Sequence, residues 1–155
     1  MRTAICGLMG LVLCATAWGT DRENFVAERP GAPLPFSDSV RVGDTLYVAG
    51  HLGLDPQTQQ APADVELEAR LVMNGVKHTV ESAGFSMDDL VSVTVFCSDI
   101  SQYDTFNRIY RSYFSGAFPA RAFIGSGTLL RGARFEVLGV AVRAKVPVAD
   151  PAAAR

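Results

Sequence analysis

Cysteine is scarce in this sequence, and its placement excludes a fold held together by disulfides. The chain has three cysteines in 155 residues, and two of them, Cys6 and Cys14, lie in an apolar N-terminal stretch. Cys97 alone cannot form an intrachain disulfide, so a hydrophobic core has to stabilise the domain. Cys97 ends an apolar stretch with no base beside it, and such a cysteine is usually a small buried hydrophobe rather than a nucleophile.

Histidine is also scarce, and the chain carries no excess of basic charge. The two histidines, His51 and His78, have no ligand spacing with cysteines or carboxylates, so the sequence indicates no metal site. The formal net charge of −2 argues against a nucleic-acid-binding protein, which normally carries a basic excess. Gly125-Ser126-Gly127 is not followed by a predicted helix, so it is no nucleotide fingerprint. We expect no metal and no organic cofactor.

The first 17 residues have the layout of a secretory signal peptide. Arg2 gives a basic start, an apolar stretch follows, and Ala15-Thr16-Ala17 offers a cleavage site between small residues. The apolar stretch is shorter than the ~20 residues that a membrane span needs. We therefore expect a secreted or periplasmic protein, with a disordered tail or an N-terminal anchor as the alternative.

The rest of the chain divides into three parts. Residues 18–37 contain Pro30, Pro33 and Pro35 and predict an irregular, extended lead-in. Residues 38–145 form the expected domain, because 48% hydrophobic and 19% charged content is typical of a compact protein. Residues 146–155 are rich in proline and alanine and predict a disordered tail.

The domain predicts the order β-β-α-β-α-β-β. Apolar residues three and four positions apart predict a helix that Asp64 caps and Gly84 ends. A Ser101–Asp104 capping box predicts a second helix that runs to about Phe114. Stretches rich in β-formers predict strands at 39–42, 45–51, 90–97, 120–125 and 134–142. Two helices on one face of a mixed sheet give an α+β two-layer domain.

The strands are apolar on both sides, which indicates a partner. In residues 90–97, alternation predicts Val91, Val93 and Val95 on one face and Leu90 and Phe96 on the other. Because the helices can cover only one face of the sheet, we expect another subunit to cover the other face.

Arg121 and Glu136 each lie inside an otherwise apolar strand, where a charge is costly unless it is paired or used. One interpretation is a structural ion pair across strands at a subunit interface. The other is a site in which Arg121 binds a small carboxylate bidentately. Glu136, partly desolvated by apolar neighbours, would then exchange protons with water. The pattern alone leaves both interpretations open.

The sequence resembles the Rid (reactive intermediate deaminase, YjgF-like) family. The similar stretches, within residues 30–143, are VRVGDTLYVAGHLGLDPQT, VESAGFSMDDLVSVTVFCSDI, YDTFNRIYRSYF, FPARAFI and FEVLGVAV. The resemblance implies a chorismate-mutase-like α+β domain that forms a homotrimer with a pocket at each subunit interface. It also implies hydrolysis of 2-imino (enamine) acids to a 2-oxo acid and ammonia.

The resemblance assigns roles to single residues. Arg121, in the PAR motif, binds the substrate carboxylate, and Glu136 activates or protonates the attacking water. Asn107 of the second helix and the backbone of Phe123 lie at the substrate. Phe36 and His51 are expected to line or support the pocket, although the position of His51 at a strand end also fits a structural role.

This chain departs from the family pattern at three places. Phe36 stands where many members have tyrosine, Ala49-Gly50-His51 where they often have Ser-Gly-Gln, and Phe123 where they have a smaller residue. These changes predict a more apolar or narrower pocket, and the sequence does not define the side chain of the preferred substrate. The alternatives to a deaminase are a non-catalytic binder of small carboxylates and, with less support given the negative charge, a ribonuclease.

Overall fold

The computed structural model describes residues 21–29 and 31–143. The predicted signal peptide (residues 1–17) and C-terminal tail (146–155) lie outside the described residues. Among the residues described, no helix combines the length and apolarity that crossing a membrane requires.

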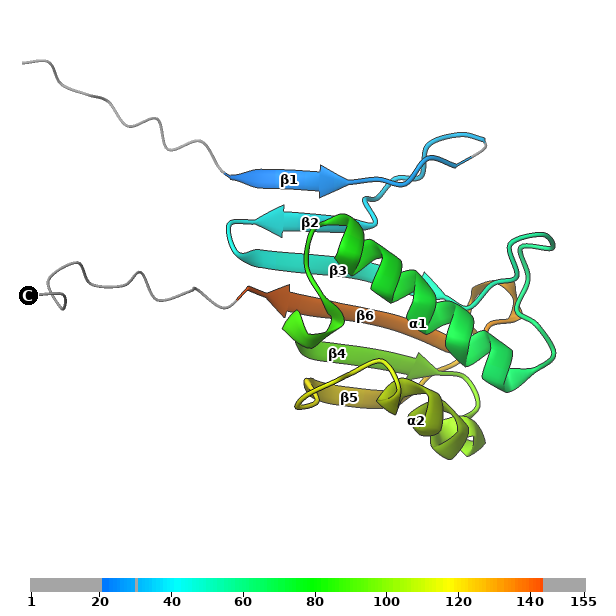
Figure 1. The fold of residues 1–155 in the computed structure, drawn as a ribbon. Coiled ribbons are helices and arrows are strands. Elements are labelled where there is room, and N and C mark those ends of the chain that lie inside the picture. The colour runs from blue at the N-terminus through cyan, green and yellow to red at the C-terminus, as the bar shows by residue number, and fades with distance from the viewer. Residues whose placement is uncertain (1–20, 30, 144–155) are drawn as a thin grey trace, which may run out of the picture.

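A six-stranded sheet forms one layer, and two helices form the other (Figure 1). The strands are β1 (Arg22–Phe25), β2 (Ser39–Val42), β3 (Thr45–Leu52), β4 (Leu90–Cys97), β5 (Ala120–Gly125) and β6 (Phe135–Val142). The helices are α1 (Val65–Ser82) and α2 (Tyr103–Arg111), with the 3₁₀ turns η1 (Met87–Asp89), η2 (Ile100–Gln102) and η3 (Leu130–Gly132). The order across the sheet is β1-β2-β3-β6-β4-β5, and β4 and β5 are its parallel pair. The predicted α+β two-layer domain with a mixed sheet is confirmed.

Helix α1 begins and ends as its sequence predicts. The Asp64 carboxylate accepts hydrogen bonds from the backbone N–H groups of Glu66 (2.9 Å) and Leu67 (3.3 Å). These bonds satisfy two of the donors that a helix start leaves free. Gly84 follows the C-cap with φ of 78°, a left-handed conformation that glycine adopts without a steric penalty.

The prediction of an irregular lead-in over 18–37 is wrong at Arg22–Phe25. These residues pair antiparallel with β2 and form the edge strand β1. Three of the four are exposed, so no alternation of buried and exposed positions marks this strand in the sequence.

The predicted capping box at Ser101 is wrong as well. Asp99 supplies the cap, because its carboxylate accepts from the Ser101 backbone N–H (3.1 Å) and hydroxyl (2.6 Å) and so begins η2 before α2. Helix α2 also ends at Arg111, three residues earlier than predicted.

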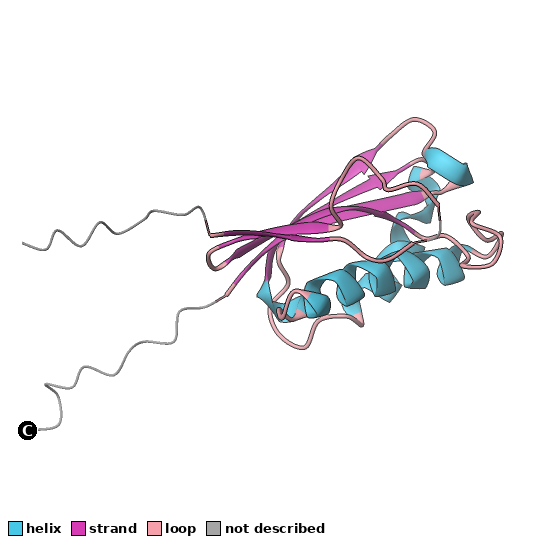
Figure 2. Cartoon of the chain, turned by 90° about the horizontal axis from the view of Figure 1, so that it is seen from above, coloured by secondary structure: helices cyan, strands magenta, loops and turns pink. Residues whose placement is uncertain are grey.

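The helices pack on one face of the sheet and leave the other face open. Leu46, Val95 and Val137 face the helices and are completely buried, and Figure 2 shows α1 lying along this face. On the opposite face, Tyr47 in β3 is 53% exposed and Val142 in β6 is 37% exposed. The open apolar face fits the expectation that another subunit covers it.

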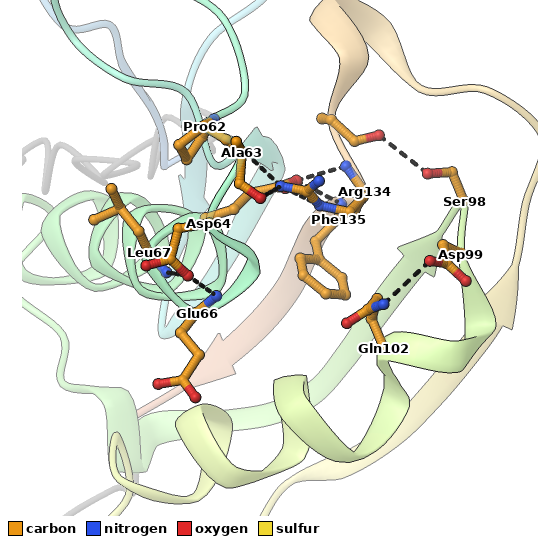
Figure 3. A network of polar contacts seen from close by, with 12 residues as sticks. Pro62, Ala63, Asp64, Glu66, Leu67, Ser98, Asp99, Gln102, Arg134 and Phe135 are labelled. Carbon is orange, nitrogen blue, oxygen red and sulfur yellow. Dashed lines mark hydrogen bonds and ion pairs between the residues drawn. The ribbon is translucent and has the colours of Figure 1, made fainter.

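A buried carboxylate joins the start of α1 to the start of β6. The fully buried Glu68 accepts hydrogen bonds from the backbone N–H groups of Arg134 (2.5 Å) and Phe135 (3.1 Å). It also accepts from the Arg134 guanidinium Nε (2.7 Å). The same guanidinium donates to the carbonyl oxygens of Pro62 and Ala63, just before α1 (Figure 3).

Replacing Glu68 tests this connection. We expect Glu68→Gln to lower the free energy of unfolding by about 3 kcal/mol, because it removes one partner of a buried ion pair. Guanidinium chloride unfolding at fixed protein concentration measures the change. Glu66→Gln is the matched control. Glu66 lies on the same helix as Glu68 but forms an exposed ion pair with Arg108 of α2, and the loss of this pair should cost less than about 1 kcal/mol. Equal losses in the two variants would contradict a special role for Glu68.

Candidate functional site

Arg121 lies on the helix-covered face of the edge strand β5, among aromatic rings from α2. Its guanidinium Nη2 donates a 2.7 Å hydrogen bond to the Asn107 side-chain oxygen. The guanidinium carbon lies 4.6 Å from the centre of the Tyr110 ring, 5.5 Å from that of Phe123 and 5.9 Å from that of Tyr103. Aromatic faces attract a guanidinium and hold its plane.

No carboxylate pairs with Arg121 among the described residues. Its partners are a neutral amide and aromatic rings, so most of its five N–H donors stay available for a ligand. The guanidinium opens into a hollow of about 180 Å³. The hollow is lined by Asn107, Tyr110, Arg111, Phe118, Pro119 and Arg121. This geometry suits the bidentate capture of a small carboxylate.

Tyr110 is the buried base of this hollow. Burial raises the pKa of its phenol to about 12, although the positive charge of Arg121 opposes the shift. The phenol therefore stays neutral at physiological pH, and its ring presents an uncharged face to the guanidinium. The Tyr110 ring also stacks on Phe118, with centroids 6.4 Å apart.

Glu136 lies on the opposite face of the sheet. Directly paired residues share a face, and the pairing joins Arg121 to Val93 and Val93 to Gly139 on the helix-covered side. Glu136 pairs with Phe96, three positions along β4, and therefore points to the open side. Within one chain, the arginine and the glutamate are separated by the sheet itself.

Gly50 makes room for the Glu136 carboxylate. Ala49 and Gly50 form a bulge in β3, where the register with β6 shifts between Val48 and His51. A Cβ atom on Gly50 would lie 2.2 Å from the Glu136 Oε1 atom, so any side chain there would displace the carboxylate. Sequence reasoning missed this role, although a glycine inside a strand is a known sign of close approach.

His51 does not share a face with Glu136. Its Nε2 atom lies 3.1 Å from the Thr79 hydroxyl of α1, and its ring packs under Gly75. Burial lowers the pKa of His51, with a smaller opposing effect of Asp38. The structure therefore places His51 between the sheet and α1 rather than in a pocket with Arg121.

Phe36 is also far from Arg121 in the same chain. It lies in the loop before β2, is 51% exposed, and belongs to the end of the sheet remote from β5. Of the predicted site residues, the structure thus brings together Arg121, Asn107 and Phe123. Glu136 and Phe36 join them only if a second copy of the chain supplies them.

The family model described as Endoribonuclease L-PSP matches residues 26–143. The chain belongs to this family. A mouse protein named 2-iminobutanoate/2-iminopropanoate deaminase is 36% identical over 115 residues, which cover 74% of this chain and 85% of the mouse protein. The human protein of the same name is 35% identical over 125 residues, covering 80% of this chain and 91% of its own length.

Solved structures of the family have the same fold. Escherichia coli TdcF with bound serine gives a TM-score of 0.71 at 31% identity, covering 79% of this chain and 100% of TdcF. RidA from an Antarctic Psychrobacter gives a TM-score of 0.67 at 31% identity, covering 74% of this chain and 93% of RidA. The resemblance to YjgF-like proteins that the sequence motifs suggested is confirmed at the level of family and fold.

The buried histidine predicts how stability depends on pH. The folded-state pKa of His51 lies below its ordinary value of 6.5. Just below that pH, His51 is therefore protonated in the unfolded chain but still neutral in the folded protein. The contribution of neutral His51 to the free energy of unfolding is therefore fully present above pH ~6.5 and is lost as the pH falls below that value. We expect His51→Gln to flatten this loss between about pH 7.5 and 5.5 in urea unfolding.

His78→Gln is the matched control for this measurement. His78 is exposed on α1, so this variant should lose stability on acidification as the wild type does. An unchanged pH dependence in His51→Gln would contradict the assignment.

Proposed function

We propose that this protein is a hydrolytic deaminase of reactive 2-imino acids. Its mouse and human relatives are named 2-iminobutanoate/2-iminopropanoate deaminase, and the Arg121–Asn107 hollow would supply the carboxylate recognition that such substrates need. This hollow is the observation that carries the proposal. The reaction consumes one water and one imine and releases a 2-oxo acid and ammonia.

Arg121 is the binding group of the proposed reaction. The guanidinium holds the substrate carboxylate by two parallel hydrogen bonds, which fixes the position of the adjacent imine carbon. Asn107 and Tyr110 hold the guanidinium from the side and from below. Phe123, on the same face of β5, lies beside the bound substrate.

Glu136 is the proton-transfer group. Its carboxylate takes a proton from water as the water oxygen bonds to the imine carbon, and the proton passes to the nitrogen. The hydroxyl proton of the resulting tetrahedral adduct then passes to the amine nitrogen, the C–N bond breaks as the carbonyl of the 2-oxo acid forms, and ammonia leaves. Glu136 serves this purpose because no residue in the described part of the chain forms an ion pair with it.

The two groups meet between copies of the chain. Because Arg121 and Glu136 lie on opposite faces of one sheet, a working site requires Arg121 of one copy and Glu136 of another. The open apolar face that carries Glu136 offers the surface for this contact. A homotrimer, the assembly that the resemblance to Rid proteins implies, gives three such sites.

A non-catalytic carboxylate binder is the second candidate. The binding half of the site is complete within one chain, whereas the glutamate is not beside it, so binding and turnover are separable. The TdcF structure with bound serine shows a relative holding a small amino acid. Binding of 2-oxo acids that depends on Arg121, without imine hydrolysis, would favour this candidate.

Two single variants and their mixture test the proposed reaction. We expect Arg121→Gln and Glu136→Gln each to lower kcat/KM by roughly 100-fold or more, since each loses a charged contact or the base. An amino-acid oxidase generates the imine, and semicarbazide traps the imine that the protein has not hydrolysed. If the site forms between copies of a trimer, assemblies that contain both variants regain about a third of wild-type activity, because one of their three interfaces carries both intact groups.

The mixed assemblies are made by co-expression and purified through two different affinity tags. Mixed assemblies without regained activity would contradict a site shared between copies. Full activity in Arg121→Gln alone would remove the deaminase proposal.

The N-terminal segment supports a proposal of export. Cleavage after Ala17 would leave a mature chain that begins at Trp18. N-terminal sequencing of the protein purified from a bacterial periplasm should give Trp18 as the first residue. A chain that begins at Met1 in that fraction would contradict cleavage.

A further inference from the structure

Two arginines, and no aspartate or glutamate, are among the described residues that line the hollow at Arg121. The second is Arg111, the last residue of α2. Asn107, Tyr110, Phe118 and Pro119 complete the lining. An imine with a single carboxylate binds one guanidinium, so Arg121 alone accounts for the binding described above. The proposed reaction assigns no role to Arg111.

Arg111 is held at the hollow by an aromatic ring rather than by an acid. Its guanidinium carbon lies 5.8 Å from the centre of the Phe118 ring. Phe118 stacks on Tyr110, which in turn lies under the Arg121 guanidinium. Two adjacent rings thus carry two cations, one on each.

Neither cation is neutralised within the described part of the chain. Arg108, one turn earlier on α2, forms an ion pair with Glu66, whereas no ion pair involves Arg111 or Arg121. Two guanidinium groups in one hollow repel each other, and a ligand with two anionic groups removes that repulsion. Each guanidinium also keeps donors free for a carboxylate.

From this pair we infer that the preferred substrates are 2-imino dicarboxylic acids, the class formed by oxidation of acidic amino acids. This inference rests on the proposed function. Arg121 binds the carboxylate next to the imine, and Arg111 binds the side-chain carboxylate at the Phe118 side of the hollow. Arg111 thereby selects the substrate and takes no part in proton transfer.

Substrate competition tests the inference. Imines are generated from glutamate, from 2-aminobutanoate and from phenylalanine by suitable oxidases, and kcat/KM is measured for each. We expect the glutamate-derived imine to be preferred, and Arg111→Gln to raise its KM about tenfold relative to that of the 2-aminobutanoate-derived imine. Arg111→Lys should restore part of the preference because it keeps the charge.

Arg108→Gln is the matched control, because it removes the same charge from the same helix outside the hollow. It should leave the ratio of the two KM values as in the wild type. A wild-type preference for the phenylalanine-derived or the 2-aminobutanoate-derived imine would overturn the inference. So would an equal effect of Arg111→Gln and Arg108→Gln on the ratio.

Calorimetric binding separates this inference from the proposed reaction. If no imine is hydrolysed at all, the deaminase proposal fails, yet the affinities for 2-oxoglutarate and 2-oxobutanoate still test the selectivity. Tighter binding of 2-oxoglutarate that is lost in Arg111→Gln supports the inference. Equal binding of the two acids overturns it.

Discussion

The buried pair between Glu68 and Arg134 fixes where the last strand begins. Glu68 accepts the backbone N–H groups of both Arg134 and Phe135, so the first residues of β6 are held against the first turns of α1. A charge with no exposed surface is expensive unless it is paired and hydrogen-bonded, and here three donors satisfy it. Because Phe135 is thereby held in the core, the alternation of the strand turns Glu136 to the open face.

The position of β5 at the sheet edge has the complementary consequence for the arginine. Arg121 points to the helix-covered face, where α2 supplies Asn107 and Tyr110 as its supports. A sheet is a continuous layer of backbone, so no side-chain movement brings Arg121 and Glu136 of one chain together. In the proposed reaction the carboxylate-binding group is therefore complete within one chain, whereas proton transfer beside the bound carboxylate would need a second copy.

Local rules predicted much of the fold. The cap at Asp64, the glycine at position 84 and the apolar spacing between them define α1, and these signals act over only a few residues. Arg121 and Glu136 were identified as candidate site residues because a charge inside an apolar strand is energetically costly unless it is paired or functional. The rules failed at two places: β1 has no alternation of buried and exposed residues, and the Ser101 hydroxyl donates to Asp99, which caps η2, instead of capping α2.

The two-layer domain, the family resemblance and the pair of charges that mark the candidate site could all be predicted from the sequence alone. That these charges lie on opposite faces of the sheet, and that His51 lies under α1, became known from the three-dimensional fold. It also singled out Glu68 from its neighbour Glu66, since both stand in the first turns of one helix and differ in what packs over them. Burial and the pairing of strands depend on residues far apart in the chain, and no local pattern contains that information.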